Sequence, residues 1–390
     1  MIVFLFWSAA AIIAYAYVGY PLWIYLQSRL RPRKWEQAEI YPSVSIVMAV
    51  HNGAKLLQEK VAHLLSLDYP ADLLEVLVVS DGSDDGTNEI LARITDSRFT
   101  SIICSEHQGK ANALNHAISR ARGEVLVFVD IRPKLEPTAL RQIVSNFADP
   151  TVGCVAGELC LRIAGHDAGT KAVSSLYWRY EQGIRKCEAL VDSPVGVYGG
   201  FYAVRRALAT TIPEGLILDD MYQPLCIVRH GFRSVIDDRA RVWDTWPKTS
   251  RAEFRRKVRT LAGNYQLVQQ VPWLLGSTNR VRFQLISHKL TRLLVPALLP
   301  ILLLTTVWLR AAQPYTTFLL AQIAFYALAV LGLAWDLPGL RRIAGPASAF
   351  VLMNVAAAVA LFMFLFRRKS LLGLWVKPSP ATEESMARAA

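Results

Sequence analysis

The 390-residue sequence lacks the phosphate-binding loops of the commonest nucleotide-dependent enzymes. It has no GxxxxGK[ST] stretch and no GxGxxG stretch, which argues against phosphate-loop ATPases and dinucleotide-binding enzymes. The five cysteines form no CxxC pair and have no metal-binding spacing, so we interpret them as reduced structural residues. No segment interleaves basic and aromatic residues, and the net charge of +12 therefore does not indicate nucleic-acid binding. We attribute this charge to contact with anionic lipid and a polyanionic substrate.

Charged residues are scarce in four long apolar stretches, which cover residues 2–26, 293–309, 315–335 and 347–366. Each is close to the roughly 20 residues that a helix needs to cross the hydrocarbon core of a membrane. Because buried core helices are seldom apolar on every face, these stretches are predicted to span a membrane. The first stretch lacks a basic leading region and a small-residue cleavage site, so it is predicted to be a retained anchor rather than a signal peptide.

Basic residues beside these stretches predict the orientation. The cluster at 29–34 directly follows the first stretch and indicates that this end faces the cytoplasm. Residues 36–290 are then predicted to be cytoplasmic. Arg341 and Arg342 fit simple alternation, whereas the basic cluster at 367–369 would lie outside after four crossings. The sequence leaves open whether the last segment is re-entrant or the charge rule fails there.

The part between the first and second apolar stretches is long enough for a folded domain of the α/β class. Short runs rich in β-branched residues, at 43–50, 75–80 and 124–130, alternate with helix-like stretches at 53–66 and 110–120. This alternation predicts a mostly parallel, Rossmann-like sheet with helices on both faces. Ligands of such sheets bind beyond the carboxyl ends of the strands.

Five segments are predicted along the chain. They are an N-terminal transmembrane helix (1–28), the cytoplasmic α/β domain (36–250), amphipathic interface helices (251–290), three transmembrane helices (291–366) and a C-terminal tail (367–390). The interface helices mix basic and apolar residues and adjoin the predicted spans, which favours the membrane surface over a solvated charged face.

Acidic residues stand at the ends of two predicted strands. Asp81 follows the second run within the segment SDGSDDGT (80–87), and Asp130 closes the third. Glycines permit tight turns, and carboxylates at strand ends accept hydrogen bonds from a base or a ribose. The segment 80–87 is therefore a candidate nucleoside pocket, with an acidic surface turn as the alternative.

The chain resembles the family 2 glycosyltransferases of GT-A fold. Six motifs, in the family's order, carry the resemblance. The apolar stretches on either side of the α/β domain are similar to those of cellulose, chitin and hyaluronan synthases and of bacterial exopolysaccharide glycosyltransferases. The motifs are SIVMAVHNG, VVSDGSDDGT, GKANALNHAISRARGEVLVFVD, YGGFYAVRRAL, ILDDMYQPLCIVRHGF and FRRKVRTLAGN. The resemblance implies an inverting transfer of sugar from a nucleotide-sugar donor.

The resemblance also implies which residues bind the donor. Ala49, Asp81 and Asp85 would line the nucleoside, and Lys110 and Arg259 would face the diphosphate. A cation beside two phosphates is sensible chemistry, although Lys110 also has the alternative role of starting a solvated helix.

The family's Asp-x-Asp motif, which holds a divalent cation, is altered. Here it consists of Asp130, Ile131 and Arg132, and an arginine cannot donate an oxygen ligand. We expect Mg²⁺ or Mn²⁺ to be held by Asp130 with help from diphosphate oxygens. In the alternative, Arg132 itself neutralises the leaving group.

The resemblance implies that Asp220 is the catalytic base, because inversion needs one carboxylate to take a proton from the acceptor hydroxyl. Asp219 replaces the family's usual Glu, and Gly231 follows at the expected spacing. The alternative is that the two acids only start a helix.

The acceptor end of the site is assigned to Asp219 and to the aromatic and glycine segment YGGFY, with a plain turn as the alternative. The predicted residues of this segment are Tyr198, Gly199, Gly200 and Phe201. In the last motif, Arg259 keeps its place but Thr260 replaces the tryptophan of processive synthases. Processivity is therefore not implied.

The sequence as a whole predicts a multi-pass protein of the bacterial inner membrane that makes exopolysaccharide or capsule. Its predicted partners are a nucleotide-sugar donor, a glycan or lipid-linked acceptor, the lipid bilayer, and a second copy or an export partner, but no nucleic acid. Two alternatives are transfer of a single sugar to a polyprenyl phosphate or membrane lipid, and a non-catalytic nucleotide-binding membrane partner.

Overall fold

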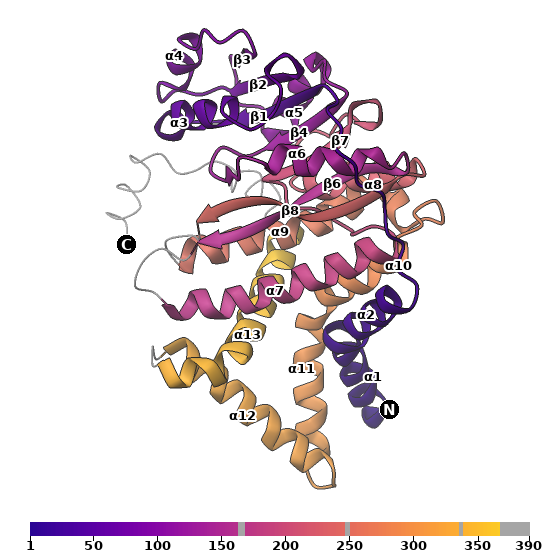
Figure 1. Ribbon diagram of the computed structural model, residues 1–390. Helices are drawn as coiled ribbons and strands as arrows, with labels where there is room; N and C mark the ends of the chain where they lie inside the picture. The colour runs from indigo at the N-terminus through magenta and orange to yellow at the C-terminus, as the bar shows by residue number, and fades with distance from the viewer. Residues whose placement is uncertain (163–167, 246–249, 335–337, 367–390) are drawn as a thin grey trace, which may run out of the picture.

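The structure is a computed structural model that describes residues 1–162, 168–245, 250–334 and 338–366. A sheet domain occupies one end of the molecule and long helices extend from it at the other end (Figure 1). The sheet has 8 strands in the order β3-β2-β1-β4-β7-β6-β8-β5. The predicted α/β class is therefore confirmed, and the described residues include the predicted apolar helices that could span a membrane.

The N-terminal half of the sheet is parallel. Strand β1 (Val44–Val50) lies between β2 (Leu74–Asp81) and β4 (Val125–Val129), and β3 (Phe99–Cys104) flanks β2. Nearly every side chain of β1, β2 and β4 is buried, as is typical of strands covered on both faces. The carboxyl ends of β1, β2 and β4 consequently share one rim of the sheet.

The second half of the sheet is mixed. Strand β7 (Phe201–Arg205) runs antiparallel to both β4 and β6 (Val152–Arg162). Strand β8 (Arg233–Thr245) runs parallel to β6, and the two-residue β5 (Lys134–Leu135) pairs antiparallel with β8. The start of β7 and the end of β8 therefore join the same rim.

Amphipathic helices cover both faces of the sheet. The first core cluster takes residues from α3 (Ala54–Leu65), α4 (Thr87–Ala92) and α6 (Ala139–Ser145). The second takes residues from α5 (Lys110–Arg120) and α8 (Asp219–Arg229). Short 3-10 helices complete the domain: η2 (Ala71–Leu73), η3 (Asn146–Ala148) and η4 (Arg206–Leu208).

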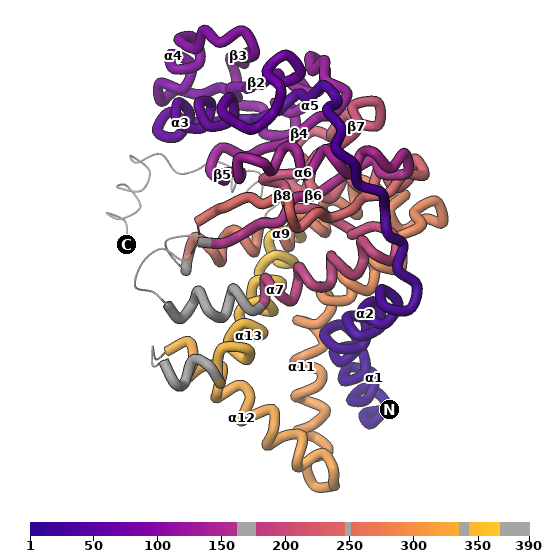
Figure 2. The backbone as a smooth tube through the Cα atoms, in the orientation of Figure 1, coloured from indigo at the N-terminus to yellow at the C-terminus, as the bar shows by residue number. Residues whose placement is uncertain are grey.

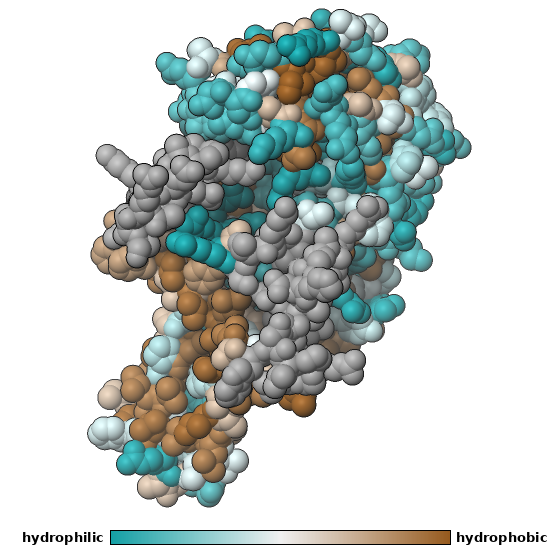
Figure 3. Space-filling model, turned by 90° about the vertical axis from the view of Figure 1, so that its left-hand side faces the viewer, coloured by the Kyte–Doolittle hydropathy of each residue, from teal (hydrophilic) through white to brown (hydrophobic). Residues whose placement is uncertain are grey.

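Among the described residues, four helical segments are long and apolar enough to cross a membrane: Ile2–Leu30, Arg282–Leu309, Tyr315–Ala334 and Ile343–Phe366. The first joins α1 (Ile2–Ala14), the π-helix η1 (Tyr15–Gly19) and α2 (Tyr20–Leu30). The others contain α10 (Arg282–Gln284), the π-helix η6 (Leu285–Leu290), α11 (Thr291–Leu309), α12 (Tyr315–Ala334) and α13 (Pro338–Phe366). Figure 3 shows their hydrophobic surface below the hydrophilic sheet domain. The predicted tail at 367–390 lies outside the described residues.

Two long helices lie between the sheet and the apolar helices. Helix α9 (Ser250–Gln270) packs against α13 and falls within the predicted interface segment, which continues through η5 (Pro272–Leu275). Helix α7 (Ala168–Val191) packs against α2 and α13, and the sequence analysis did not predict it. The connection from α2 to β1 runs along the side of the sheet domain (Figure 2).

A buried ionic cluster fastens α7 to the apolar helices. His288 is fully buried, with Nδ1 2.8 Å from Glu188 and Nε2 2.9 Å from Glu181. Arg292 lies 2.8 Å from Glu181, and Lys289 also pairs with it. Because a broken buried pair leaves an uncompensated charge, this cluster is expected to fix the position of α7 firmly.

Candidate active site

Residues from three distant parts of the chain meet at Lys110, the first residue of α5. Its Nζ lies 3.1 Å from Oδ1 of Asp130 and 3.3 Å from Oδ2 of Asp219. Burial acts to lower the pKa of Lys110, but Asp130, Asp219 and Asp220 outweigh it and raise the pKa above its usual range. Lys110 therefore stays charged.

Asp81 ends β2 and orders the turn that precedes Lys110. Its carboxylate accepts hydrogen bonds from the backbone N–H groups of Gln108 and Gly109, each at 2.8 Å. The ring nitrogen Nδ1 of His107 lies 2.8 Å from the same carboxylate, and His107 stacks on His51 with ring centroids 4.0 Å apart. Asp81 thus lies at the rim that carries Lys110, with its oxygens engaged by the protein itself.

The segment 80–87 is a tight loop that needs a glycine at position 82, because the backbone of His107 lies too close for a side chain there. Gly82 has φ +59°, and a Cβ there would lie 2.4 Å from the backbone nitrogen of His107. Asp85 is exposed and accepts hydrogen bonds from the N–H of Ala54 at 3.1 Å and from Thr87. Partial burial acts to raise the pKa of Asp85, yet these hydrogen bonds lower it overall. Ala49, in β1, is half-buried beside this loop's strand.

Asp219 and Asp220 form the first turn of α8. A helix N-terminus favours negative charge, but burial is the stronger influence and raises the pKa of both carboxyls, that of Asp220 to about 6. For Asp220, the neighbouring Asp219 adds to the rise, and Lys110 opposes it. Gly199 lies against this acid, since a Cβ at Gly199 would be 3.0 Å from Oδ2 of Asp220.

Arg132 forms an ion pair with Asp244, a residue that was not predicted from the sequence. Its guanidinium lies 3.2 Å from Oδ2 of Asp244, a nearly buried carboxylate in β8, and the hydroxyl of Tyr198 donates to the same oxygen at 3.3 Å. Asp244 stands near a strand end, as Asp81 does, and the same signal would have identified it had β8 been predicted.

Arg259 reaches the site from α9. Burial lowers the pKa of its guanidinium, and the opposing influences come from Asp130, Asp220 and Asp219, so it lies within electrostatic range of all three. Asp130 and Gly200 are joined by a backbone hydrogen bond of 3.3 Å. The rim therefore gathers Lys110 and Arg259 around its acids.

Phe201 is the one predicted acceptor residue whose side chain is withdrawn from the rim. Its ring is fully buried in the first core cluster, because β7 alternates its side chains between the two faces of the sheet. Phe201 therefore has no face to offer a sugar, whereas Tyr198 and Gly199 are partly exposed.

The acids at the rim only partly suit a divalent cation. Asp130 has a half-exposed carboxylate that pairs with Lys110, and the position two residues later is Arg132. The described residues contain no group of three or more His, Cys, Asp and Glu placed to hold a metal. A hard cation at Asp130 would need its other oxygen ligands from a diphosphate and water.

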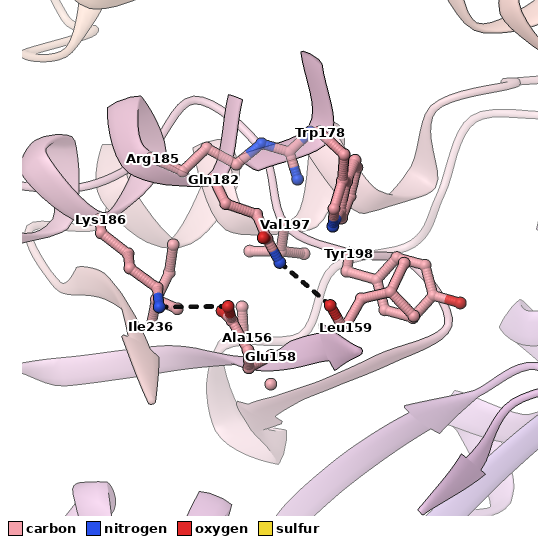
Figure 4. A pocket seen from close by; sticks show the side chains of 11 residues that line it. Ala156, Glu158, Leu159, Trp178, Gln182, Arg185, Lys186, Val197, Tyr198 and Ile236 are labelled. Atoms are coloured by element: carbon pink, nitrogen blue, oxygen red, sulfur yellow. Dashed lines mark hydrogen bonds and ion pairs between the residues drawn. The ribbon is translucent and has the colours of Figure 1, made fainter. Parts of the chain in front are cut away.

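A pocket adjoins Asp220 on the side of α7 (Figure 4). It holds about 300 Å³ of empty space, its open mouth included. Helix α7 forms one wall and strands β6 and β8 the other. Its lining is Ala156, Gly157, Glu158, Leu159, Trp178, Gln182, Arg185, Lys186, Val197, Tyr198 and Ile236. The N–H of Val197 donates to the backbone oxygen of Asp220 at 3.0 Å, so the pocket and the candidate base are directly adjacent.

Part of the sheet domain is similar to proteins of known family. Residues 45–209 match the family model described as glycosyl transferase family 2. Over 230 residues the chain is 23% identical to poly-beta-1,6-N-acetyl-D-glucosamine synthase of Staphylococcus aureus (strain COL), covering 58% of this chain and 55% of that protein. It is also 23% identical over 249 residues to the probable glycosyltransferase YdaM of Bacillus subtilis (strain 168), covering 60% and 58%. The matches thus span little more than half the length of these curated relatives.

A solved structure extends the likeness to the apolar helices. The mannosyltransferase PcManGT from Pyrobaculum calidifontis, in complex with GDP-Man and Mn²⁺, superposes with a TM-score of 0.68 at 25% identity. The likeness covers 93% of this chain and 99% of that one.

Proposed function

We propose that this chain, whose sheet domain matches the glycosyl transferase family 2 model and whose fold resembles that of a mannosyltransferase, transfers a sugar, with inversion, from a nucleotide-sugar donor to a growing exopolysaccharide or capsule glycan. The similarity to a poly-beta-1,6-N-acetyl-D-glucosamine synthase supports a polysaccharide product. The single observation that carries the mechanism is the place of Asp220, between the cations of the rim and the pocket below α7.

The donor binds at the rim of the sheet. Its nucleoside lies over the loop that contains Asp81 and Asp85, beside Ala49. Its diphosphate meets Lys110, Arg132 and Arg259, whose fixed positive charges stabilise the negative charge that develops on the leaving group. Lys110 is already held between Asp130 and Asp219, so it needs little reorganisation when the donor arrives.

Asp220 removes the proton from the acceptor hydroxyl while that oxygen attacks the anomeric carbon from the face opposite the diphosphate. The bond between the anomeric carbon and the phosphate oxygen breaks, and its electron pair leaves with the nucleoside diphosphate. A pKa of about 6 makes Asp220 a stronger base than an ordinary aspartate, yet it remains ionised at neutral pH. Tyr198 and the glycines 199–200 shape the acceptor side.

Asp130 would hold a Mg²⁺ or Mn²⁺ ion against the donor diphosphate, as the presence of Mn²⁺ with the mannosyltransferase relative suggests. Such an ion, when bound, supplies additional positive charge to the leaving group. Arg132 stands where the family's second carboxylate would be, so this chain's own cations carry a larger share of that neutralisation.

The proposed location is the bacterial inner membrane, with the sheet domain in the cytoplasm. Four candidate spanning helices and the basic cluster at 29–34 support this orientation. Single cysteines placed in the sheet domain should react with a membrane-impermeant maleimide only after the cells are opened. Labelling in intact cells would show that the sheet domain lies on the outer side of the membrane.

The activity is tested by a screen of nucleotide sugars for release of nucleoside diphosphate by the purified full-length protein, followed by analysis of the product. We expect one donor to be consumed and the new glycosidic bond to have the anomeric configuration opposite to that of the donor. Asp72→Asn changes an exposed acid far from the rim and serves as the matched control for Asp220→Asn. A product with retained configuration, or no turnover of any donor, would refute the proposal.

Transfer to a membrane lipid is the second candidate, and the contact of α7 and α9 with the apolar helices favours it, because that contact brings the acceptor side close to the bilayer. Mass analysis of the product separates the two. A lipid that carries one sugar supports the second candidate, and a long glycan supports the first.

A further inference from the structure

The pocket below α7 contains two buried hydrogen-bond donors that the protein leaves unused. Nε1 of Trp178 and Nε of Arg185 are both inaccessible, and neither has a hydrogen-bond partner among the described residues. A buried unpaired donor is costly, because the group has lost its water without gaining a replacement. The two residues lie on the same wall of the pocket, and the guanidinium carbon of Arg185 is 5.5 Å from the centre of the Trp178 ring (Figure 4).

Arg185 is only loosely paired with its neighbouring carboxylates. Its nearest carboxylate is Glu181 at 3.9 Å, the outer limit of an ion pair. Glu181 is already bound more closely by His288, Lys289 and Arg292 in the buried ionic cluster. Arg185 therefore brings a net positive charge to the pocket.

The other charged residues of the pocket are paired with one another. Lys186 lies 3.1 Å from Glu158, and Gln182 donates to the backbone oxygen of Leu159 at 3.1 Å, as Figure 4 shows. These groups already have partners and are therefore less available to a ligand. Among the described residues that line the pocket, only Trp178 and Arg185 have a buried side-chain N–H group without a hydrogen-bond acceptor. Arg185 also carries a positive charge.

We propose that this pocket binds an acidic group of the acceptor, a phosphate or a carboxylate, through the N–H groups of Trp178 and Arg185. The inference rests on the proposed function, since it names the class of acceptor for the same site. A charged acceptor oxygen makes the strong, charge-assisted hydrogen bonds that arginine is shaped to donate.

The geometry places that acidic group next to the reacting hydroxyl. Val197 and Tyr198 line the pocket, and the following residue, Gly199, lies against Asp220. An acceptor held by Arg185 is therefore oriented toward the candidate base. Trp178 and Tyr198 contact each other edge to face, with ring centroids 6.5 Å apart, and form an apolar wall for the neighbouring sugar.

The test follows the indole N–H resonance of Trp178 in full-length protein labelled with ¹⁵N-tryptophan in detergent, assigned by comparison with Trp178→Phe. Four probes are titrated: farnesyl phosphate and its neutral counterpart farnesol, and methyl glucuronide and its neutral counterpart methyl glucoside. We expect a saturable downfield shift with one anionic probe and none with its neutral partner. The probe that binds distinguishes a lipid phosphate from a sugar carboxylate.

Matched variants on the same helix make the result specific. Arg185→Gln is expected to weaken binding of the anion by at least tenfold, and Arg185→Lys, which keeps the charge but loses the planar fork, by less. Arg179→Gln changes an exposed residue of α7 and is expected to bind the anion as the wild type does. Equal binding of anionic and neutral probes, an unmoved Trp178 resonance, or an unchanged affinity in Arg185→Gln would overturn the inference.

Failure of the inference and failure of the proposed function give different results. Titration with UDP and GDP checks that the donor site of Arg185→Gln is intact. Normal turnover with no anion binding at Trp178 refutes the inference alone. Anion binding in a protein that turns over no nucleotide sugar refutes the proposed function alone. If Arg185 only tunes the base, its substitution moves the pH profile and leaves the Michaelis constant for the acceptor unchanged, which also overturns the inference.

Discussion

The pH dependence of transfer should report the raised pKa of Asp220. Burial and the neighbouring Asp219 raise it from 3.8 to about 6, whereas an ordinary aspartate is ionised throughout the range in which enzymes are assayed. Because only the ionised form accepts a proton, kcat/KM should be level above pH 7 and fall about tenfold for each pH unit below 6. At pH 5 we therefore expect about one tenth of the plateau value.

The charge of the neighbouring Asp219 predicts the direction in which the pH profile should shift. Asp219→Asn removes a negative charge that raises the pKa of Asp220, so the acid limb should move to lower pH. Asp72→Asn, an exposed acid on the far side of the domain, should leave the limb where it is. The assay is nucleoside diphosphate release from pH 5 to 9, with initial rates at low acceptor concentration.

The same pKa predicts a pH-dependent change in stability. The native state favours protonated Asp220, so this stabilisation is present below pH 4 and is lost as the pH rises through about 6. The rise of the pKa corresponds to about 3 kcal/mol, and partial exposure reduces it to about 1–2 kcal/mol. Asp220→Asn, which stays uncharged, should thus raise the melting temperature at pH 7.5 but not at pH 4. A profile that stays level to pH 5, together with a melting temperature that Asp220→Asn leaves unchanged at pH 7.5, would refute the reasoning.

Three further predictions follow from the geometry. Gly199→Ala places a methyl group 3.0 Å from the carboxylate of Asp220 and should lower kcat by at least tenfold with little change in donor affinity, measured by steady-state kinetics and nucleotide titration; an unchanged kcat contradicts the placement of the base. Glu188→Ala breaks the buried pair with His288 and should cost about 3–5 kcal/mol of stability, followed by thermal melting in detergent against Glu89→Ala as an exposed control. Excess chelator should remove most of the activity, and Mn²⁺ should restore it. Full activity in chelator would show that Arg132, rather than a metal ion at Asp130, neutralises the leaving diphosphate.

The strands and their terminal acids could be predicted from the sequence because both signals are local. β-branched runs identify β1, β2 and β4, and the acids Asp81 and Asp130 follow directly from where two of these strands end. The four apolar stretches are likewise evident from composition. The candidate spanning helices begin and end within a few residues of them, except that the second begins earlier than predicted. That segment starts at Arg282 because a polar helical turn, which includes His288 and Lys289, is continuous with α11.

Features that depend on tertiary packing could not be predicted in this way. Helix α7 carries Glu181 and Glu188, whose partners on the second apolar segment lie at least 100 residues away in the sequence, so these buried acids have no local explanation. Phe201 looked like a sugar-stacking residue, but the register of β7 turns its ring into the core. Asp244 was missed because its strand, β8, was not recognised.

Donor binding and sugar transfer by Asp220→Asn test the central claim most directly. The claim is that one rim of the sheet binds the nucleotide while a single acid on α8 activates the acceptor. Calorimetric titration with the nucleoside diphosphate of the accepted donor should give an affinity within about threefold of the wild type, while transfer falls by at least about 10²-fold. Retained transfer by Asp220→Asn, with the donor site intact, would contradict the account.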